Sequence, residues 1–582
     1  MSVPPDKMNS PRVAPLTFDA QGKPTHSWNL SPSFLGDAVH LYLPPDKVLP
    51  VIFVPGIMGS NLKSKDTDKK TGKPVWRLDM AGGSGLPKKL LGKMFVGAGG
   101  RQKTLHPDRT EVDPMGDIPD KPAGLVTNAK DYRNRYWGEV AEGSYHDFLL
   151  WLEKSLNGQG WNPDKWSEFG YLAFRAAPKP GTRAPENPLS PGITMTMRGL
   201  PGGAEKGMLA PVMSDDLLAR ANFRMPVYAC GYNWLASNEK SAMALQQRIN
   251  KVMEKYGSRC QQVILVTHSM GGLVARRCAQ LPGMGSKIAG IVHGVMPSEG
   301  APVAYRRCKL GMSDEGSGIA ASVGALVIGN NGREVTAVFS QAPGALQLLP
   351  TPHYRQGWLT VRDSEGKALN IQPVNDPYDD IYLRRDRWWG LVREAWLAPK
   401  GGVPIEWTTY AKNIEESRKF HDAIRAKYHA NTYVYYGADT AQPSFETITW
   451  HIETPSYGVY GQATPSPQRP AATTVSRFNF DNVVDMGENP LHVMERPSPN
   501  AGVYGQPTVH WRLRCSKQDG AGDGTVPFRS GAAPLQGVKE GSIQQQFRLA
   551  GFDHEGSYKN AGAQQVTLYA LVKIAASAKK QA

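Results

Sequence analysis

The sequence predicts an α/β protein with a mostly parallel sheet and helices on both faces. Two observations support this class. Short apolar runs recur along the 582-residue chain at 48–54, 225–229, 263–266, 288–293 and 432–436, and a sixth strand is predicted at 545–550. Amphipathic helical patterns follow several of these runs. Strands that alternate with helices are typical of a doubly wound parallel sheet.

One stretch makes the class more specific. Gln261–Gln280 reads QQVILVTHSMGGLVARRCAQ. A strand, a tight turn and a helix with Ser269 at the apex form the nucleophile elbow of an α/β-hydrolase. Small residues two before and two after the serine let the strand and helix pack closely. Gly271 fills the later position, but Thr267 stands where the usual pattern has glycine. The alternative reading is a plain strand-to-helix turn with an incidental serine.

The elements before the elbow suit the same fold. Residues 1–44 are polar and proline-rich, and we expect an N-terminal arm there. The buried run Val48–Val54 ends in Pro55-Gly56-Ile57-Met58-Gly59. A glycine-rich turn after an early strand is where α/β-hydrolases place an oxyanion-hole amide. The run at 225–229 leads to a predicted helix, Asn238–Lys255, with Gly257 as its stop.

Three insertions interrupt the predicted core, which takes residues 45–66, 225–300, 431–440 and 515–582. The first, 67–224, contains an amphipathic helix at Tyr145–Leu156 and a Gly/Lys-rich stretch, Gly82–Gly100, that is either a mobile lid or an ordered loop. The second, 301–430, is predicted as a helical cap with a Trp-rich helix at Trp388–Trp396 and a charged helix at Lys412–His429. The third is 441–514. After the last run, a helix at Gln564–Ser577 is expected to cover the sheet.

Charge and cysteine content limit the classes of function. The net charge is +15, but the basic residues are dispersed and show no nucleic-acid-binding signature. A solvated surface with modest attraction to anionic membranes is expected. No zinc-ligand spacing is visible, so neither a metal nor a cofactor is predicted. Five widely spaced cysteines and an N-terminus without a Sec signal pattern suggest a protein made in a reducing cytoplasm.

A serine nucleophile needs a base, and the base needs an orienting acid. In this fold the chain order is serine, acid, histidine. His554 directly follows the last predicted strand, where the base belongs, whereas His268 adjoins the serine and is expected to point away from it. Two acids remain open. Asp439 directly follows a strand, and Asp523 lies between glycines in the turn GDGTVP.

Several motifs resemble the lecithin:cholesterol acyltransferase-like lipases, α/β-hydrolases that are similar to the GPI inositol-deacylases and to bacterial phospholipases. They are, in chain order, VPGIMGSNL (54–62), GYNW (231–234), HSMGG (268–272), LQLLP (346–350), GDGTVP (522–527) and DH (553–554). The resemblance implies Ser269 as nucleophile, Asp523 as orienting acid and His554 as general base. It also implies that the backbone amides of Met58 and Met270 form the oxyanion hole.

The insertions, for example Arg135–Glu153, also resemble those of bacterial lipase effectors delivered by type VI secretion. This second resemblance implies a membrane phospholipid substrate, a secretion apparatus, a cognate immunity protein and action in the periplasm of a target cell. No nucleic-acid partner is expected.

Two other functions stay open at this stage. The same catalytic set suits an acyltransferase or an esterase for a small or polymeric ester outside membranes. A hydrolase-like scaffold that only binds an anionic partner is the non-enzymatic alternative.

Overall fold

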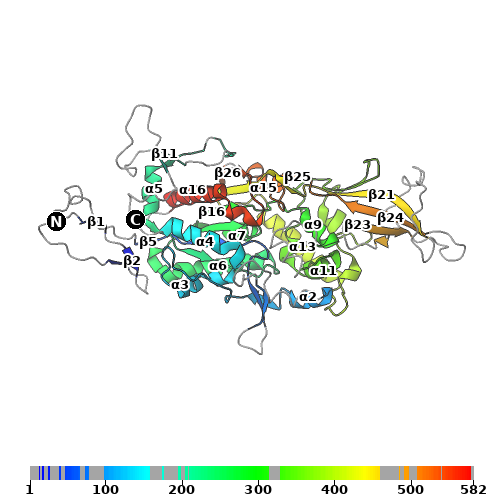
Figure 1. The fold of residues 1–582 in the computed structure, drawn as a ribbon, viewed down its shortest axis with the longest axis horizontal. Coiled ribbons are helices and arrows are strands. Elements are labelled where there is room, and N and C mark those ends of the chain that lie inside the picture. The colour runs from blue at the N-terminus through cyan, green and yellow to red at the C-terminus, as the bar shows by residue number, and fades with distance from the viewer. Residues whose placement is uncertain are drawn as a thin grey trace, which may run out of the picture.

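A six-stranded parallel sheet forms the centre of the protein (Figure 1). All five pairs of neighbouring strands run parallel. The strands lie in the order β14 (Val227–Ala229), β6 (Val51–Val54), β15 (Val263–His268), β16 (Ile288–Gly294), β19 (Thr432–Gly437) and β26 (Ile543–Leu549). Each strand overlaps one of the six strands predicted from the sequence.

The structure is a computed structural model. It describes residues 46–65, 72–77, 97–157, 203–207, 209–312, 328–458, 508–538 and 541–578, and the backbone of short strands within 12–40, 174–197 and 484–496. The predicted N-terminal arm lies mostly outside these residues, as does the predicted lid up to residue 96. The division of the chain into a core and three insertions stays a prediction, although all six central strands fall in the predicted core ranges.

Alternate residues of the central strands pack on opposite faces of the sheet. Ile52 and Val54 of β6 join a buried cluster with α6 (Asn238–Tyr256) and α7 (Gly271–Ala279). Val51 and Phe53 join a second cluster with α4 (Glu142–Asn157) and α16 (Ala561–Ser577). Side chains of a strand point alternately to its two faces, so a strand buried on both sides reads as a continuous apolar run. The sheet is therefore covered on both faces.

Local sequence sets the ends of the helix that precedes the elbow. The Ser237 side chain caps α6 by accepting a hydrogen bond from the Glu239 amide at 3.2 Å. Gly257 follows the last residue of the helix with φ of +57°, a conformation that glycine adopts without a steric penalty. The helix thus occupies Asn238–Tyr256, in agreement with the predicted Asn238–Lys255.

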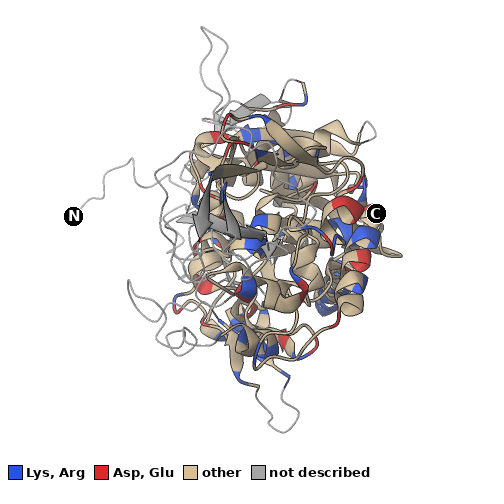
Figure 2. Ribbon diagram, turned by 90° about the vertical axis from the view of Figure 1, so that its right-hand side faces the viewer, with Lys and Arg blue, Asp and Glu red and all other residues tan. Residues whose placement is uncertain are grey.

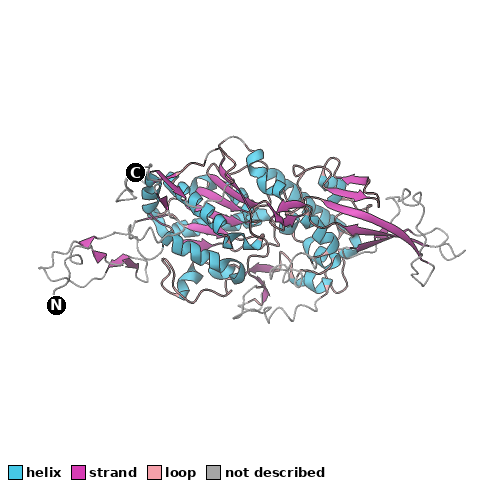
Figure 3. Cartoon of the chain, turned by 45° about the horizontal axis from the view of Figure 1, so that its top comes forward, coloured by secondary structure: helices cyan, strands magenta, loops and turns pink. Residues whose placement is uncertain are grey.

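A second sheet extends away from the central sheet (Figure 3). Its order is β18 (Ala368–Gln372), β17 (Leu359–Arg362), β21 (Ile448–Gly458), β24 (Thr508–Cys515), β23 (Leu491–Arg496) and β22 (Val484–Asp485). Only β17 and β21 pair in parallel. Two of these strands come from the range predicted as a helical cap and four from the third predicted insertion, so the two ranges meet in one sheet.

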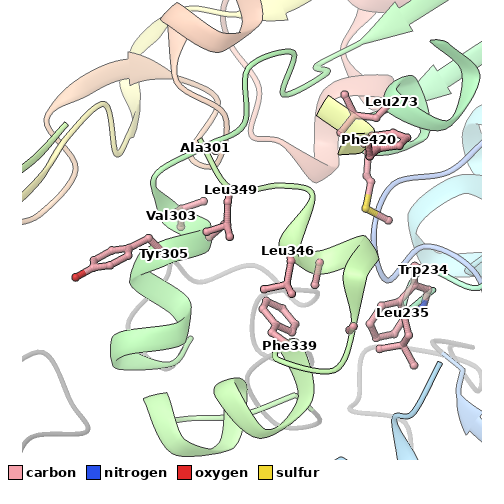
Figure 4. Close-up of a cluster of buried hydrophobic side chains, with 14 of the residues drawn as sticks. Trp234, Leu235, Leu273, Ala301, Val303, Tyr305, Phe339, Leu346, Leu349 and Phe420 are labelled. Carbon is pink, nitrogen blue, oxygen red and sulfur yellow. The ribbon is translucent and has the colours of Figure 1, made fainter. Parts of the chain in front are cut away.

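Cap helices pack against the core through a continuous apolar cluster (Figure 4). The helices are α9 (Val303–Leu310), α11 (Gly332–Phe339), α12 (Pro343–Leu346) and α13 (Trp407–Ile424). Val303, Phe339, Leu346 and Phe420 of these helices belong to the same buried cluster as Leu273 of α7. The cap is therefore joined to the helix that follows the nucleophile elbow.

The predicted helix at Trp388–Trp396 is wrong. Only Glu394–Trp396 forms a short 3₁₀ helix. The buried Lys309 ammonium donates to the carbonyls of Trp388 at 2.6 Å and Gly390 at 3.2 Å, groups that a continuous helix would use for its own hydrogen bonds. Trp388 packs edge-on against Trp450, with ring centroids 5.8 Å apart. Distant tertiary contacts therefore override the local pattern.

Two features of the structure concern the predicted surface charge and contact with membranes. Figure 2 shows lysines and arginines interspersed with acidic residues over the side that it presents, in agreement with a dispersed basic charge. Within the described ranges, no helix is both long and apolar enough to cross a bilayer.

Candidate active site

Ser269 lies at a strained turn between the centre of the sheet and α7. Its φ is +52°, in the left-handed region that non-glycine residues rarely adopt. A Cβ atom on Gly271 would lie 2.4 Å from the Val54 carbonyl oxygen and 2.5 Å from that of Pro55. Only glycine fits there, because the helix starts directly against the loop after β6. This is the geometry of a nucleophile elbow, in which the strained turn presents the serine above the sheet.

Thr267 occupies the position where the usual elbow has glycine. Its side chain is fully buried, and its Oγ1 lies 2.9 Å from Nδ1 of His293 on the adjacent strand β16. Burial lowers the pKa of His293 to about 3, so this imidazole is neutral near pH 7. The larger residue is accommodated because its hydroxyl has a hydrogen-bond partner inside the core.

His554 lies between Ser269 and an acidic side chain. It follows β26 and immediately precedes a 3₁₀ helix, Glu555–Lys559. Its Nε2 is 2.8 Å from Oγ of Ser269, and its Nδ1 is 2.8 Å from Oδ2 of Asp523. The structure thus brings together the three residues that the sequence selected from positions far apart in the chain.

Asp523 is oriented by its own turn. It follows the short strand β25 (Gly520–Gly522) and is almost fully buried. Oδ1 accepts hydrogen bonds from the backbone amides of Thr525 at 3.0 Å and Val526 at 2.7 Å. One carboxylate oxygen is therefore held by the turn, which leaves the other for the His554 imidazole. The GDGTVP motif supplies both the turn and the amides.

The other acid that the sequence left open, Asp439, has a different role. Its carboxylate accepts hydrogen bonds from the amides of Ala441 and Gly551, both at 2.8 Å. These two bonds hold the pKa of Asp439 below its ordinary value. Gly551 belongs to the loop that leads to His554, so Asp439 attaches this loop to the segment that follows β19 rather than orienting the imidazole.

Backbone amides near the serine are available to a ligand. Within the described part of the chain, the amides of Ile57, Met58 and Met270 donate to no hydrogen-bond acceptor. Met58 has φ of +63°, and its carbonyl accepts a 2.6 Å hydrogen bond from the Trp76 indole, which fixes this strained residue. Met270 is the N-cap of α7, where the helix dipole favours negative charge. Sequence reasoning selected Met58 and Met270 but overlooked Ile57, whose amide is equally free.

A cavity of about 440 Å³ opens above these groups. One set of lining residues is apolar or aromatic and includes Ile57, Met58, Trp76, Tyr145, Pro297, Ala301, Val303, Ala304, Met312, Leu348, Pro443 and Val526. A second set is polar or charged and comprises Ser144, Arg307, Gln442, Gln518, Asp553 and Glu555. Val303, Ala304 and Arg307 recur at helical spacing on one face of α9. A ligand with a long apolar part and a polar part suits such a lining.

His268 is placed differently from the expectation. It was expected to point away from the serine, but it lines the cavity beside Ser269. Its Nε2 is 2.9 Å from the backbone carbonyl of His554, and its Nδ1 is 3.0 Å from the hydroxyl of Tyr145 on α4. These contacts still exclude His268 as the base for Ser269. Nothing in the sequence signalled this link, because Tyr145 reads only as part of an amphipathic helix.

Comparisons with known proteins support the fold. The model of the PGAP1-like alpha/beta domain family matches residues 227–313, which include the elbow. The crystal structure of the Tle4–Tli4 complex contains a chain that is 28% identical, with a TM-score of 0.64, covering 91% of this chain and 99% of that one. Phospholipase PlaB from Legionella pneumophila also matches, at 10% identity over 50% of this chain and 72% of its own, but its TM-score of 0.14 carries no argument. No curated protein matches.

These findings confirm the predicted α/β-hydrolase fold and the predicted resemblance to lipases of that fold. The structural similarity covers nearly all of both chains, so it includes the cap regions as well as the central sheet. The family match covers the strands and helices around the nucleophile elbow.

Proposed function

We propose that this ester-hydrolysing α/β-hydrolase is a phospholipase in which Ser269, His554 and Asp523 act as the catalytic triad. The observation that carries the proposal is the continuous pair of 2.8 Å contacts from Ser269 through His554 to Asp523, at the floor of a largely apolar cavity. A hydroxyl becomes a competent nucleophile when a base removes its proton and an acid orients that base.

The proposed reaction has two halves. His554 Nε2 takes the proton of Ser269 as Oγ attacks the ester carbonyl, and the backbone amides of Met58 and Met270 stabilise the oxyanion. The imidazolium then protonates the leaving alcohol, which departs as lysophospholipid and leaves an acyl-Ser269 ester. In the second half, His554 deprotonates water, which attacks this ester and releases the fatty acid, and the imidazolium returns the proton to Oγ of Ser269. Asp523 stabilises the imidazolium in both halves.

The lining of the cavity supports a lipid substrate. The apolar residues of α9 and of the loop after β6 suit an acyl chain, because burying each methylene gains roughly 0.8 kcal/mol. The polar residues around Ser144 and Gln518 suit the glycerol and head-group side of the same molecule. An acyltransferase or an esterase for a soluble ester would use the same triad. The products of the reaction therefore distinguish these two activities from a phospholipase.

We further propose that the protein is an antibacterial effector delivered by type VI secretion and inhibited by a cognate immunity protein. The chain similar to this one was crystallised as a complex of Tle4 with Tli4, which supports a dedicated protein partner. Attack on phospholipids in the periplasm of a target cell would be the consequence of delivery.

The decisive experiment compares wild type, Ser269→Ala and Ser417→Ala on vesicles of mixed bacterial phospholipids, with products identified by mass spectrometry. Ser417 is a buried serine of α13 that donates to the Asn413 carbonyl, and it serves as the matched control. Fatty acid and lysophospholipid are expected from wild type and Ser417→Ala, whereas Ser269→Ala should lose roughly 10⁶-fold in kcat. Undiminished lipid cleavage by Ser269→Ala would disprove the proposed mechanism. Transfer of the acyl group to an added alcohol, without free fatty acid, would identify an acyltransferase.

A further inference from the structure

A chain of hydrogen bonds connects the loop after β6 with the backbone of His554. The Gly56 amide donates to the hydroxyl of Tyr145 at 3.1 Å. That hydroxyl lies 3.0 Å from Nδ1 of His268, and Nε2 of His268 lies 2.9 Å from the carbonyl oxygen of His554. Both side chains are only 4% exposed, so water does not compete for these bonds. The chain joins the oxyanion loop, α4, the elbow and the loop of the proposed base.

The proton on each atom of this chain is determined. A carbonyl oxygen can only accept, so Nε2 of His268 carries a hydrogen. Burial, reinforced by the nearby His554, lowers the pKa of His268 to about 3, so its imidazole is neutral near pH 7 and Nδ1 is a free acceptor. The Tyr145 hydroxyl must then donate to Nδ1 while it accepts from Gly56. All three hydrogen bonds point in one direction and polarise one another.

We propose that Tyr145 and His268 are positioning residues that fix the main chain at His554 and so hold its imidazole between Ser269 and Asp523. This inference rests on the proposed function, in which His554 is the general base. Neither residue reaches the Ser269 hydroxyl by a hydrogen bond, so their effect on the reaction passes through the placement of His554.

Other contacts between α4 and the same loop support this role. The Ser144 hydroxyl donates to Glu555 at 2.8 Å, and the rings of Phe148 and Tyr558 lie 4.0 Å apart. These contacts attach the residues that follow His554, whereas the hydrogen bond from His268 acts on the main chain of residue 554 itself. A shift of about 1 Å in a reacting group can cost about 100-fold in rate, so the loss of this link should be visible in kcat.

The test uses Tyr145→Phe, His268→Leu and His268→Gln, assayed for kcat and KM on a short soluble ester. We expect kcat to fall about 10- to 100-fold in Tyr145→Phe and His268→Leu, with KM unchanged, because positioning of the base affects the chemical step. His268→Gln should recover most of the loss, since the glutamine amide can donate from the position of Nε2.

Two matched controls separate positioning from the loss of any buried hydrogen bond. Tyr132→Phe removes a buried tyrosine hydroxyl that donates to the Lys121 carbonyl. His146→Leu removes a buried histidine of α4 whose Nε2 contacts the Trp137 carbonyl. Both controls should lower the melting temperature and leave the kcat of the folded protein near the wild-type value.

A second readout does not depend on turnover. The proton between Nδ1 of His554 and Asp523 should give a far-downfield NMR signal, and we expect it to broaden or shift in Tyr145→Phe and His268→Leu but not in the controls. If His268→Leu does not fold, Tyr145→Phe, which removes a single oxygen atom, carries the test.

The outcomes distinguish this inference from the proposed function. Wild-type kcat and an unchanged downfield signal in both Tyr145→Phe and His268→Leu, with Ser269→Ala and His554→Ala inactive, would overturn the positioning role and leave the triad standing. A loss in kcat no greater than that of the two controls would overturn it as well. Full activity of Ser269→Ala would instead refute the proposed function.

Discussion

Four buried histidines should make this protein sensitive to mild acid. Burial lowers the pKa of His146 and His421 to about 4 and that of His268 and His293 to about 3. In the unfolded chain each would have the ordinary pKa of about 6.5. As the pH falls below that value, these histidines become protonated in the unfolded state but stay neutral in the folded state. The stability contributed by these groups is therefore complete above pH 6.5 and is lost progressively below it.

The size of the loss follows from the same values. Between pH 7.5 and pH 5, each unfolded histidine gains about 2 kcal/mol from protonation, and the four together gain about 8 kcal/mol. At pH 5 the folded forms are still almost entirely unprotonated, so little of this gain is offset. The free energy of unfolding of a typical domain is about 5–15 kcal/mol, so a decrease of this size should bring the protein close to unfolding.

Tryptophan fluorescence during urea unfolding at a series of pH values between 7.5 and 5 measures this effect. His421→Gln provides the matched comparison, because His421 lies on α13, where Nε2 is 2.8 Å from the Gln347 carbonyl. This variant should lose stability with falling pH more gradually than wild type, by about 2 kcal/mol less over the range. A wild-type protein as stable at pH 5 as at pH 7.5, or equal slopes for the two proteins, would refute the reasoning.

Three further predictions concern the site. In Gly56→Ala the new Cβ would lie 2.9 Å from Nδ1 of His268 and 3.0 Å from Cβ of Ser269, so kcat should fall about 100-fold. In Gly285→Ala the nearest contact of the new Cβ is 3.5 Å, so kcat should not change. Ester turnover measures both effects. Asp523→Asn should lower kcat about 10⁴-fold, and equal kinetics for Asp523→Asn and Asp439→Asn would contradict the assignment of the acid. Thr267→Ala leaves Nδ1 of His293 without its hydrogen-bond partner. This variant should lower the free energy of unfolding by about 1–3 kcal/mol in a denaturation experiment and leave kcat unchanged. An unchanged free energy of unfolding would argue against that hydrogen bond.

Much of the core could be predicted because it obeys local rules. Five of the six central strands are buried along their whole length, so they stand out as apolar runs without alternation. The sixth, β26, is less apolar and leaves Gln544 and Arg548 exposed. The turns around Ser269 and Asp523 depend on neighbouring small residues and can be recognised as motifs. Chain order then selects His554. The roles of these residues, and of the Met58 and Met270 amides, stay predictions until they are measured.

The features that escaped prediction depend on partners distant in the sequence. The link from Tyr145 to His268 spans 123 positions, and the one from His268 to His554 spans 286. Lys309 redirects the backbone at Trp388 across 79 positions. The sharing of one sheet by two predicted insertions likewise arises from pairing of distant strands. No periodicity or local propensity carries such information.

The separation of 285 residues between Ser269 and His554 also has a consequence in time. Ribosomes add about 5–20 residues per second, so the proposed nucleophile is synthesised roughly 15 to 60 seconds before the proposed base. Asp523 is likewise synthesised late. A newly made chain therefore lacks the complete proposed triad during most of its synthesis. If the proposed function holds, the cell that makes the protein is not exposed to its activity before the last strand of the central sheet has been synthesised.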